Sequence, residues 1–196
     1  MKHINRILMA CLLLVSCPAT TSSAIAAEKR LAYLVSDLRI PFWDIMKRGV
    51  AHRAAELGYK LDVYSAENEA KREIEFTAKA IKDKVDGIIV SPTNSSAAVT
   101  ILKFAKSAGI PVVIADIGTD AGEYVSYIAS DNFDGSYQLG KILATALKSR
   151  QWDKGGVGII SILQTRANGK AGTAGFMKAF DEAGTRGGDL RQQVNF

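Results

Sequence analysis

Short apolar runs alternate with longer amphipathic stretches from residue 31 onward. The apolar runs predict strands, at 31–35, 61–64, 85–90, 110–115, 125–129 and 157–161. The run at 31–35 is apolar at every position, which is the pattern of a strand covered on both faces of a parallel sheet. The amphipathic stretches predict helices, at 41–57, 69–83, 95–108, 132–147 and 170–183. Strands and helices that alternate at this spacing form right-handed βαβ units. The sequence therefore predicts an α/β fold, a doubly wound parallel sheet covered by helices on both faces.

The spacing of apolar residues also predicts which side of each helix is buried. Pro41 suits the first helical turn, and apolar positions then recur at helical spacing until Gly58, a natural stop. In the second helix, Ile74, Ala78 and Ile81 form the side expected to pack on the sheet. Both helices are therefore expected to contact the sheet through one apolar face.

Polar loops follow the predicted strands at the edge where open α/β sheets bind ligands. These loops are 37–43, 91–95, 116–119 and 130–132. They combine aromatic rings with hydroxyls, amides and carboxylates. Such a mixture suits a neutral polyhydroxylated molecule, whose C–H faces stack on rings while its hydroxyls donate and accept hydrogen bonds. We therefore expect a ligand site among these loops.

Candidate side chains in these loops also have purely structural interpretations. Phe42 and Trp43 are either ligand-stacking rings or core residues packed under the loop. Asn94 is either a ligand contact or a helix cap. Asp116 directly follows the fourth predicted strand with no obvious helix start behind it, which favours an acid that faces a cleft.

The beginning of the chain has the features of an export signal. Lys2 and Arg6 precede an apolar run at 7–15, and small residues follow, so we predict a signal peptide at 1–26. Ordinary cleavage at the end of this segment would release the exported protein. Cys17 lies in a lipobox-like context and offers the alternative of a lipid anchor. The apolar run is too short to span a bilayer comfortably, which disfavours a transmembrane anchor.

Composition gives the predicted exported part little net charge and no thiol chemistry. The full sequence has 25 Lys and Arg against 20 Asp and Glu, and removal of Lys2 and Arg6 leaves 23 against 20, a balance of +3. This weak charge, spread along the helices, does not favour a nucleic-acid partner. Cys11 and Cys17 both fall inside the signal segment, so disulfides and thiol catalysis are not expected.

The sequence does not match the motifs of nucleotide or metal enzymes. The glycine-rich stretch 155–158 precedes a predicted strand, whereas a dinucleotide-binding turn follows one. Gly169 and Lys170 are followed by Ala171, where a P-loop requires Ser or Thr. His52 is the only histidine of the exported part, which disfavours a histidine triad or a histidine-rich zinc site. We expect a protein without enzymatic activity, with no catalytic residue, no cofactor and no metal.

Five segments, in their order and spacing, resemble the periplasmic sugar-binding proteins of the ribose-binding type: LVSDLRIPFW, GYKLDVYSAEN, DGIIVSPTNSSA, AGIPVVIADI and YIASDN. The resemblance implies the type I periplasmic-binding-protein fold, in which two lobes close around a small sugar and present it to an ABC importer. It also implies a periplasmic, monomeric substrate-binding component without catalytic activity. The alternative is a ligand-binding sensor component that signals to a membrane kinase or chemoreceptor.

The same resemblance suggests which side chains bind the ligand. Phe42 and Trp43 match the paired aromatics that stack on the sugar, and Asp116 matches the aspartate that binds its hydroxyls. Ser91 falls where an asparagine often sits. The full predicted ligand-binding set is Phe42, Trp43, Asp116, Ser91, Asp37, Asn94 and Lys170.

Three positions depart from the family pattern. Ile40 replaces a polar residue before the proline, Ile117 replaces the arginine that usually follows the aspartate, and Lys170 falls near the place of a second-lobe arginine. Arginine and lysine do not grip vicinal hydroxyls in the same way. Another sugar, a polyol or a sugar-derived signal is therefore at least as suitable as ribose. Arg166 or Lys170 would supply positive charge from the second lobe, unless both lie in a solvated loop.

The resemblance divides the chain into a signal peptide at 1–26, a first lobe at 27–131 and the start of a second lobe at 132–196. The second lobe of such receptors contains several more βα units, and this sequence ends partway into a further strand. We expect a complete first lobe and an incomplete second lobe, through truncation or a frameshift, with a genuinely short protein as the alternative. A lobe with so few strands has little core and is expected to be marginal by itself.

Overall fold

The computed structural model describes residues 28–184 and 191–193. The predicted signal peptide at 1–26, and Cys17 with it, lies outside the described residues. Helices and strands alternate along the chain in the predicted order. They are β1 (Arg30–Val35), α1 (Pro41–Glu56), β2 (Lys60–Ser65), α2 (Ala70–Lys82), β3 (Gly87–Ser91), α3 (Ser95–Ser107), β4 (Val112–Ala115), β5 (Ser126–Ile128), α4 (Asn132–Ser149), β6 (Ile159–Ser161), α5 (Ala167–Glu182) and β7 (Arg191–Gln193).

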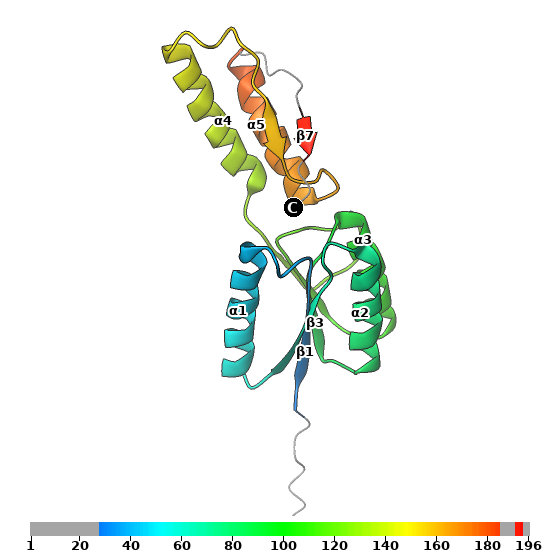
Figure 1. The fold of residues 1–196 in the computed structure, drawn as a ribbon. Coiled ribbons are helices and arrows are strands. Elements are labelled where there is room, and N and C mark those ends of the chain that lie inside the picture. Colours follow the sequence, from blue (N-terminus) through cyan, green and yellow to red (C-terminus); the bar gives the residue numbers. More distant parts are fainter. Residues whose placement is uncertain (1–27, 185–190, 194–196) are drawn as a thin grey trace, which may run out of the picture.

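The elements from β1 to β5, which we call the first unit, form one parallel sheet in the order β2-β1-β3-β4-β5. Helix α1 covers one face of this sheet, and α2 and α3 cover the other (Figure 1). The predicted doubly wound parallel sheet is therefore confirmed. Because the strands are parallel, their carboxyl ends meet at a single edge. This edge faces the remaining elements of the chain (Figure 1).

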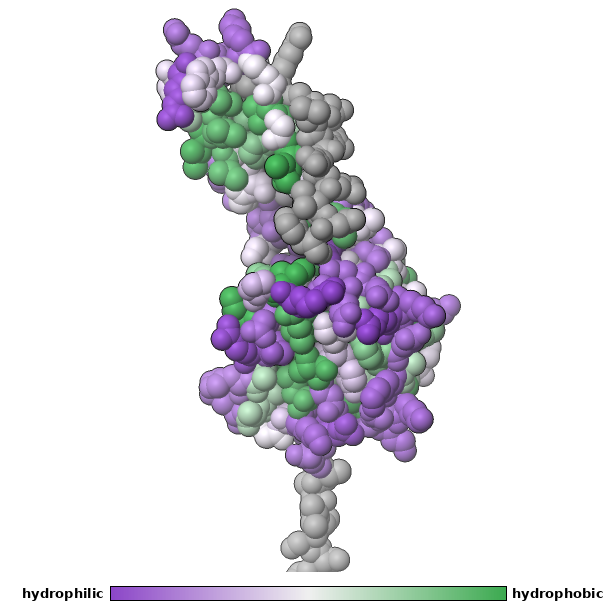
Figure 2. Space-filling view, in the orientation of Figure 1, coloured by the Kyte–Doolittle hydropathy of each residue, from purple (hydrophilic) through white to green (hydrophobic). Residues whose placement is uncertain are grey.

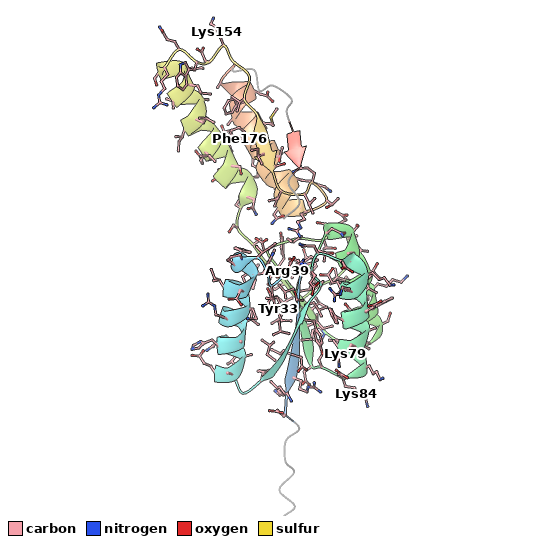
Figure 3. All side chains as sticks on the ribbon, in the orientation of Figure 1. Tyr33, Arg39, Lys79, Lys84, Lys154 and Phe176 are labelled. Atoms are coloured by element: carbon pink, nitrogen blue, oxygen red, sulfur yellow. The ribbon has the colours of Figure 1, made fainter. Side chains whose placement is uncertain are left out.

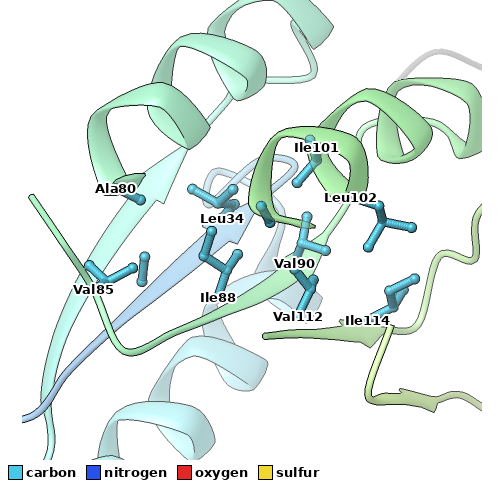
Figure 4. Close-up of a cluster of buried hydrophobic side chains, with 11 residues drawn as sticks. Leu34, Ala80, Val85, Ile88, Val90, Ile101, Leu102, Val112 and Ile114 are labelled. Carbon is cyan, nitrogen blue, oxygen red and sulfur yellow. The ribbon is translucent and has the colours of Figure 1, made fainter. Parts of the chain in front are cut away.

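Two clusters of buried apolar side chains hold the helices on the sheet. The larger cluster lies between the sheet and α2 and α3, and includes Leu34, Ile88 and Ile101 (Figure 4). The smaller cluster, on the α1 face, includes Tyr33 and Trp43. Neighbouring residues of β1 thus point to opposite faces of the sheet, as the strand geometry requires. Burial on both faces explains why the first strand is apolar at every position from 31 to 35 rather than at alternate positions.

The buried side of α2 differs from the predicted one. Of the expected face, Ile74 and Ile81 are only partly buried and Ala78 is exposed, whereas Glu73 and Ala80 are fully buried. The reason is that the Glu73 carboxylate accepts hydrogen bonds from the loop after β3, which compensates the loss of its hydration. A hydrophobic pattern treats a carboxylate as solvent-exposed and therefore orients this helix incorrectly.

The elements α4, β6, α5 and β7 form a second unit beside the carboxyl edge of the first (Figure 1). Helix α5 begins at Ala167, earlier than the predicted 170, because the Ser95 hydroxyl accepts a hydrogen bond from the Ala167 backbone N–H at 2.9 Å. Strands β6 and β7 pair in parallel. Figure 2 shows hydrophobic residues gathered on the visible face of this unit. On α4, Leu139 and Ile142 are exposed. Within the described residues, no helix combines the length and hydrophobicity that a membrane crossing requires.

Helices α4 and α5 approach each other closely at two glycines. A Cβ atom added to Gly140 would lie 2.7 Å from the Cβ of Ala179. One added to Gly175 would overlap the carbonyl oxygen of Phe133. Neither overlap is compatible with the close packing of a protein interior. The two helices can therefore approach this closely only because glycine, which has no side chain, occupies both positions.

We expect Gly175→Ala to destabilise the second unit by about 1–3 kcal/mol, because the new methyl group meets backbone atoms of α4 rather than a flexible side chain. The matched control is Gly135→Ala on α4, where an added Cβ has no neighbour within 4 Å. Helix propensity alone should stabilise that variant by up to about 1 kcal/mol. Urea unfolding and hydrogen exchange of the α4 and α5 amides measure both effects. Equal stability of the two variants would contradict the close helix contact.

Candidate functional site

A cavity of about 330 Å³ lies between the carboxyl edge of the sheet and the segment that leads into α5. Its wall comes from the start of α1, the residue after β4 and the segment after β6. The lining residues are Ile40, Phe42, Trp43, Asp116, Ile162, Leu163, Arg166 and Asn168. In Figure 3, Arg39 lies at this edge of the sheet, and Tyr33 lies below it inside the first unit. The volume is within the range of small-molecule sites.

A larger cavity of about 540 Å³ lies between α1 and the sheet. Its wall is largely aliphatic and includes Leu31, Val50, Ile89 and Val113. It lies away from the carboxyl ends of the strands, where open α/β sheets bind ligands. Of its three polar lining residues, Arg53 is paired with Glu56 and Asp86 accepts a hydrogen bond from the Arg30 N–H. We therefore assign the functional site to the smaller cavity.

Phe42 and Trp43 both line the smaller cavity, but they differ in burial. Pro41, at the first position of α1, starts the helix directly at the sheet edge, so both rings lie in its first turn. The rings form an edge-to-face pair with centroids 4.8 Å apart. Trp43 is 4% exposed and packs against Tyr33 in the core, whereas Phe42 is 50% exposed. Trp43 is therefore a core residue with one edge at the cavity, and Phe42 presents an open ring.

Asp116 follows β4 and contributes a partly buried carboxylate to the cavity. Its backbone is in the left-handed region, with φ of 67°, a conformation that Asp tolerates better than most residues. Its Oδ2 accepts a hydrogen bond from Asn168 Nδ2 at 2.9 Å. Burial raises the pKa of this carboxyl group, and the nearby Arg166 and the hydrogen bond from Asn168 oppose that shift. This left-handed residue directly follows the end of β4, where the chain leaves the extended conformation of the strand.

Arg166 connects the second unit to the first unit at the cavity. Its Nε donates to the Thr93 carbonyl oxygen and its Nη2 donates to Asn68 Oδ1, each at 2.9 Å. Only 8% of the residue is exposed. Burial lowers the pKa of the guanidinium, and Asp116 is the first of three carboxylates that oppose this effect. A buried cation held by two hydrogen bonds fixes the start of α5 against the sheet edge.

Of the two predicted cations, Arg166 lines the cavity and Lys170 does not. Lys170 is exposed and lies outside the lining, with its Nζ 3.9 Å from Asp120 Oδ1. Sequence reasoning missed Asn168 altogether. The signal that points to this amide is its place shortly after the strand predicted at 157–161, since loops at the carboxyl ends of strands carry ligand residues.

Three further residues of the predicted set lie at the carboxyl edge of the sheet but outside the cavity lining. Ser91 is fully buried, and its hydroxyl lies 3.0 Å from that of Tyr33. Asn94 is the N-cap of α3 and accepts a hydrogen bond from the Ala97 N–H, as its structural interpretation predicts. Asp37, the third, is also buried.

Asp37 forms a polar cluster beneath the cavity. Its carboxylate accepts hydrogen bonds from Arg39 Nε at 2.8 Å, from Arg39 Nη2 at 2.7 Å and from Asn68 Nδ2 at 2.9 Å. The guanidinium of Arg39 lowers the pKa of this carboxyl group below its usual value. Because Asn68 also accepts from Arg166, the cluster extends to the cavity. Asp37 therefore supports Arg166 from below rather than lining the cavity itself.

Glu73 holds the loop after β3 from the other side. Its carboxylate oxygens accept hydrogen bonds from the Thr93 N–H and the Thr93 hydroxyl, both at 3.0 Å. Burial raises the pKa of Glu73 to about 7, against the opposing effects of Thr93 and Arg166. Thr93 thus contacts Glu73 through its amide and hydroxyl and Arg166 through its carbonyl oxygen. This threonine links α2 to the start of α5.

We expect the free energy of unfolding to fall as the pH rises from about 4.5 to about 7. In this interval folded Glu73 retains a proton that the unfolded chain has released, so each increase in pH favours unfolding. Glu73→Gln keeps the shape of the side chain and removes its titration, and should flatten this part of the pH dependence. Glu75→Gln, an exposed position of the same helix, is the control and should change it little. Urea unfolding across the interval measures the slopes; the same slope in the parent and in Glu73→Gln would refute the assignment.

The chemistry of the cavity suits binding. Phe42 offers a ring face, Asp116 a hydrogen-bond acceptor and Arg166 a donor. Among the residues that the structure describes, no three His, Cys, Asp or Glu side chains come together as a metal site would require. An aromatic surface beside a carboxylate and a guanidinium matches a small molecule with an apolar face and several hydroxyls.

The structure is an α/β domain with a partly polar cavity at the carboxyl edge of its parallel sheet. Residues 31–193 match the family model of the periplasmic binding protein domain. The chain belongs to this family, and the type I periplasmic-binding-protein fold that its sequence segments imply is confirmed.

Relatives of the ribose-binding type are among the similar sequences. The ribose import binding protein of Escherichia coli is 34% identical over 130 residues, which are 66% of this chain and 44% of that protein. The D-ribose/D-allose-binding protein of Pseudomonas aeruginosa is 30% identical over an alignment of 202 positions, which covers 95% of this chain and 62% of that protein. The chain thus spans less than half the length of the first relative and less than two thirds of the second.

Solved structures show the same fold. A carbohydrate transporter solute-binding protein from Agrobacterium radiobacter, in complex with D-arabinose, aligns with a TM-score of 0.78 at 23% identity, covering 87% of this chain and 59% of that one. A periplasmic solute-binding protein of an ABC transporter from Actinobacillus succinogenes, with bound D-allose, aligns with a TM-score of 0.73 at 29% identity, covering 85% and 60%.

Proposed function

We propose that this protein captures a small sugar or a related polyhydroxylated molecule in the periplasm and presents it to an ABC permease. The observation that carries the proposal is the cavity in which Phe42, Asp116 and Arg166 face one space. One relative is named for the import of ribose and another for the binding of D-ribose and D-allose, which supports a sugar as the ligand class. The same capture step would serve a membrane kinase or chemoreceptor, the alternative partner.

In this proposal the protein is an exported monomer without enzymatic activity. Residues 1–26 direct export, with a lipid anchor at Cys17 as the alternative to a free periplasmic protein. Residues 27–131 act as the first lobe and 132–196 as the start of the second. The hydrogen bonds of Arg166 to Thr93 and Asn68 connect the two, and hinge motion between lobes would open and close the cavity.

Each side chain of the cavity has a different role in binding the ligand. The exposed ring of Phe42 stacks on C–H groups of the sugar, and Asp116 accepts hydrogen bonds from its hydroxyls. Arg166 donates from the other side of the cavity. Trp43 supports Phe42 by edge-to-face packing and closes the bottom of the cavity.

The exported chain is expected to gain thermal stability with one class of sugar or polyol. Ligand at about 100 times its Kd stabilises the folded state by roughly 2.7 kcal/mol, which a melting experiment detects. A panel of pentoses, hexoses, polyols and their phosphates identifies the class. The absence of a shift with every member of the panel would refute sugar capture by this chain.

Substitutions in the cavity should weaken the binding of the sugar found in this way. Asp116→Asn fits the left-handed backbone, removes the charge and should reduce affinity by about tenfold to a hundredfold. Phe42→Ala should reduce affinity by at least about tenfold through the loss of apolar contact. Phe42 is preferred over Trp43 because truncation of a buried aromatic costs about 3–5 kcal/mol of stability.

The matched control is Asp120→Asn, which removes an exposed carboxylate from the same loop outside the cavity. Its affinity should equal that of the parent. Titration calorimetry of the parent and the three variants measures the differences. If both Asp116→Asn and Phe42→Ala bound the sugar as tightly as the parent, the ligand site would have to lie outside this cavity.

A further inference from the structure

The wall of the proposed ligand cavity has a polar part and an aliphatic part. The polar lining residues are Asp116, Arg166 and Asn168. The aliphatic lining residues are Ile40, Ile162 and Leu163, and the two aromatic rings complete the wall. The composition of the ligand should follow this division, because a buried hydroxyl without a hydrogen-bond partner is costly whereas a buried methyl group is favourable.

Much of the hydrogen-bonding capacity of the polar residues is already used within the protein. Asn168 donates to Asp116 Oδ2 and accepts from the Gly169 N–H, each at 2.9 Å. Arg166 uses Nε and Nη2 for contacts to the first unit. Asp116 Oδ1 and Arg166 Nη1 have no hydrogen-bond partner among the described residues. These two groups are the strongest positions for ligand hydroxyls, and both belong to the polar part of the wall.

The aliphatic part of the wall comes from both units and is closely packed on the α5 side. Ile40 precedes α1, and Ile162 and Leu163 follow β6. A Cβ atom added to Gly169 would lie 2.7 Å from the Leu163 carbonyl oxygen and 3.0 Å from Ile162 Cγ1. The first turn of α5 therefore presses on this segment, which limits its freedom to rearrange around a polar group.

On the basis of the proposed function, we infer that the ligand is a deoxy monosaccharide. Such a sugar carries a methyl group where a common hexose carries a hydroxymethyl group. Its methyl group would contact Ile40, Ile162 and Leu163, while its ring hydroxyls bind Asp116 and Arg166. A hexose would lose hydration of its extra hydroxyl against the aliphatic wall, and a pentose would leave that part of the cavity unfilled.

Matched sugars test this inference in titration calorimetry with the exported chain. Each set contains a deoxyhexose, the hexose with one more hydroxyl and the pentose with one carbon fewer. The sets are L-fucose with L-galactose and D-arabinose, L-rhamnose with L-mannose and L-lyxose, and D-quinovose with D-glucose and D-xylose. One deoxyhexose should bind about tenfold to a hundredfold more tightly than its hexose, since an apolar pocket rejects an added hydroxyl only to that extent.

A pair of variants tests the aliphatic wall directly. The side chains introduced by Ile162→Thr and Ile162→Val have nearly the same shape, and they differ by a hydroxyl in place of a methyl group. Because Ile162 is 39% exposed, neither change should prevent folding. Ile162→Thr should reduce the preference for the deoxyhexose over the hexose severalfold, and Ile162→Val should retain it.

The outcomes separate this inference from the proposed function. A deoxyhexose preference that Ile162→Thr reduces and Ile162→Val retains supports both. Binding of a hexose or pentose as tightly as its deoxyhexose overturns the inference and leaves sugar capture standing, as does a preference that neither variant changes. The absence of binding by every sugar, including those of the wider panel, overturns both.

Discussion

The buried guanidinium of Arg166 determines how the two units of this structure meet. A buried cation is tolerated only when hydrogen bonds and nearby negative charge replace its hydration. The Thr93 carbonyl oxygen and the Asn68 side chain supply the hydrogen bonds, and Asp116 supplies charge. These partners come from separate loops at one sheet edge. The position of α5, and with it half of the cavity wall, depends on their convergence.

Most of the fold could be predicted because periodicity reports which faces of an element are buried. The order of strands and helices, and the parallel sheet, follow from apolar runs and amphipathic stretches. The rule that ligands bind at carboxyl ends placed Asp116 and the two rings of α1 at one edge, and the structure brings them to one cavity. Buried polar groups were the source of error, because Glu73 is a core residue only through its hydrogen bonds to a loop distant in sequence.

The candidate site was harder to predict than the fold, because polar residues at a sheet edge have two uses that composition does not distinguish. Ser91 is hydrogen-bonded to Tyr33, and Asn94 caps the start of α3. Asp37 accepts hydrogen bonds from Arg39 and Asn68. Such residues position the lining without forming it. The structure supports them as scaffolding for the cavity.

The left-handed backbone of Asp116 restricts how this site could change its specificity. Only Gly, Asn and Asp adopt that conformation at little cost, so most replacements at this position would strain the turn before they altered recognition. Sequence change is less constrained at Phe42, whose ring is half exposed on a helix turn. A library built to change the specificity of this cavity would therefore keep position 116 nearly fixed and randomise position 42. New selectivity would then arise from the shape of the wall rather than from its charge.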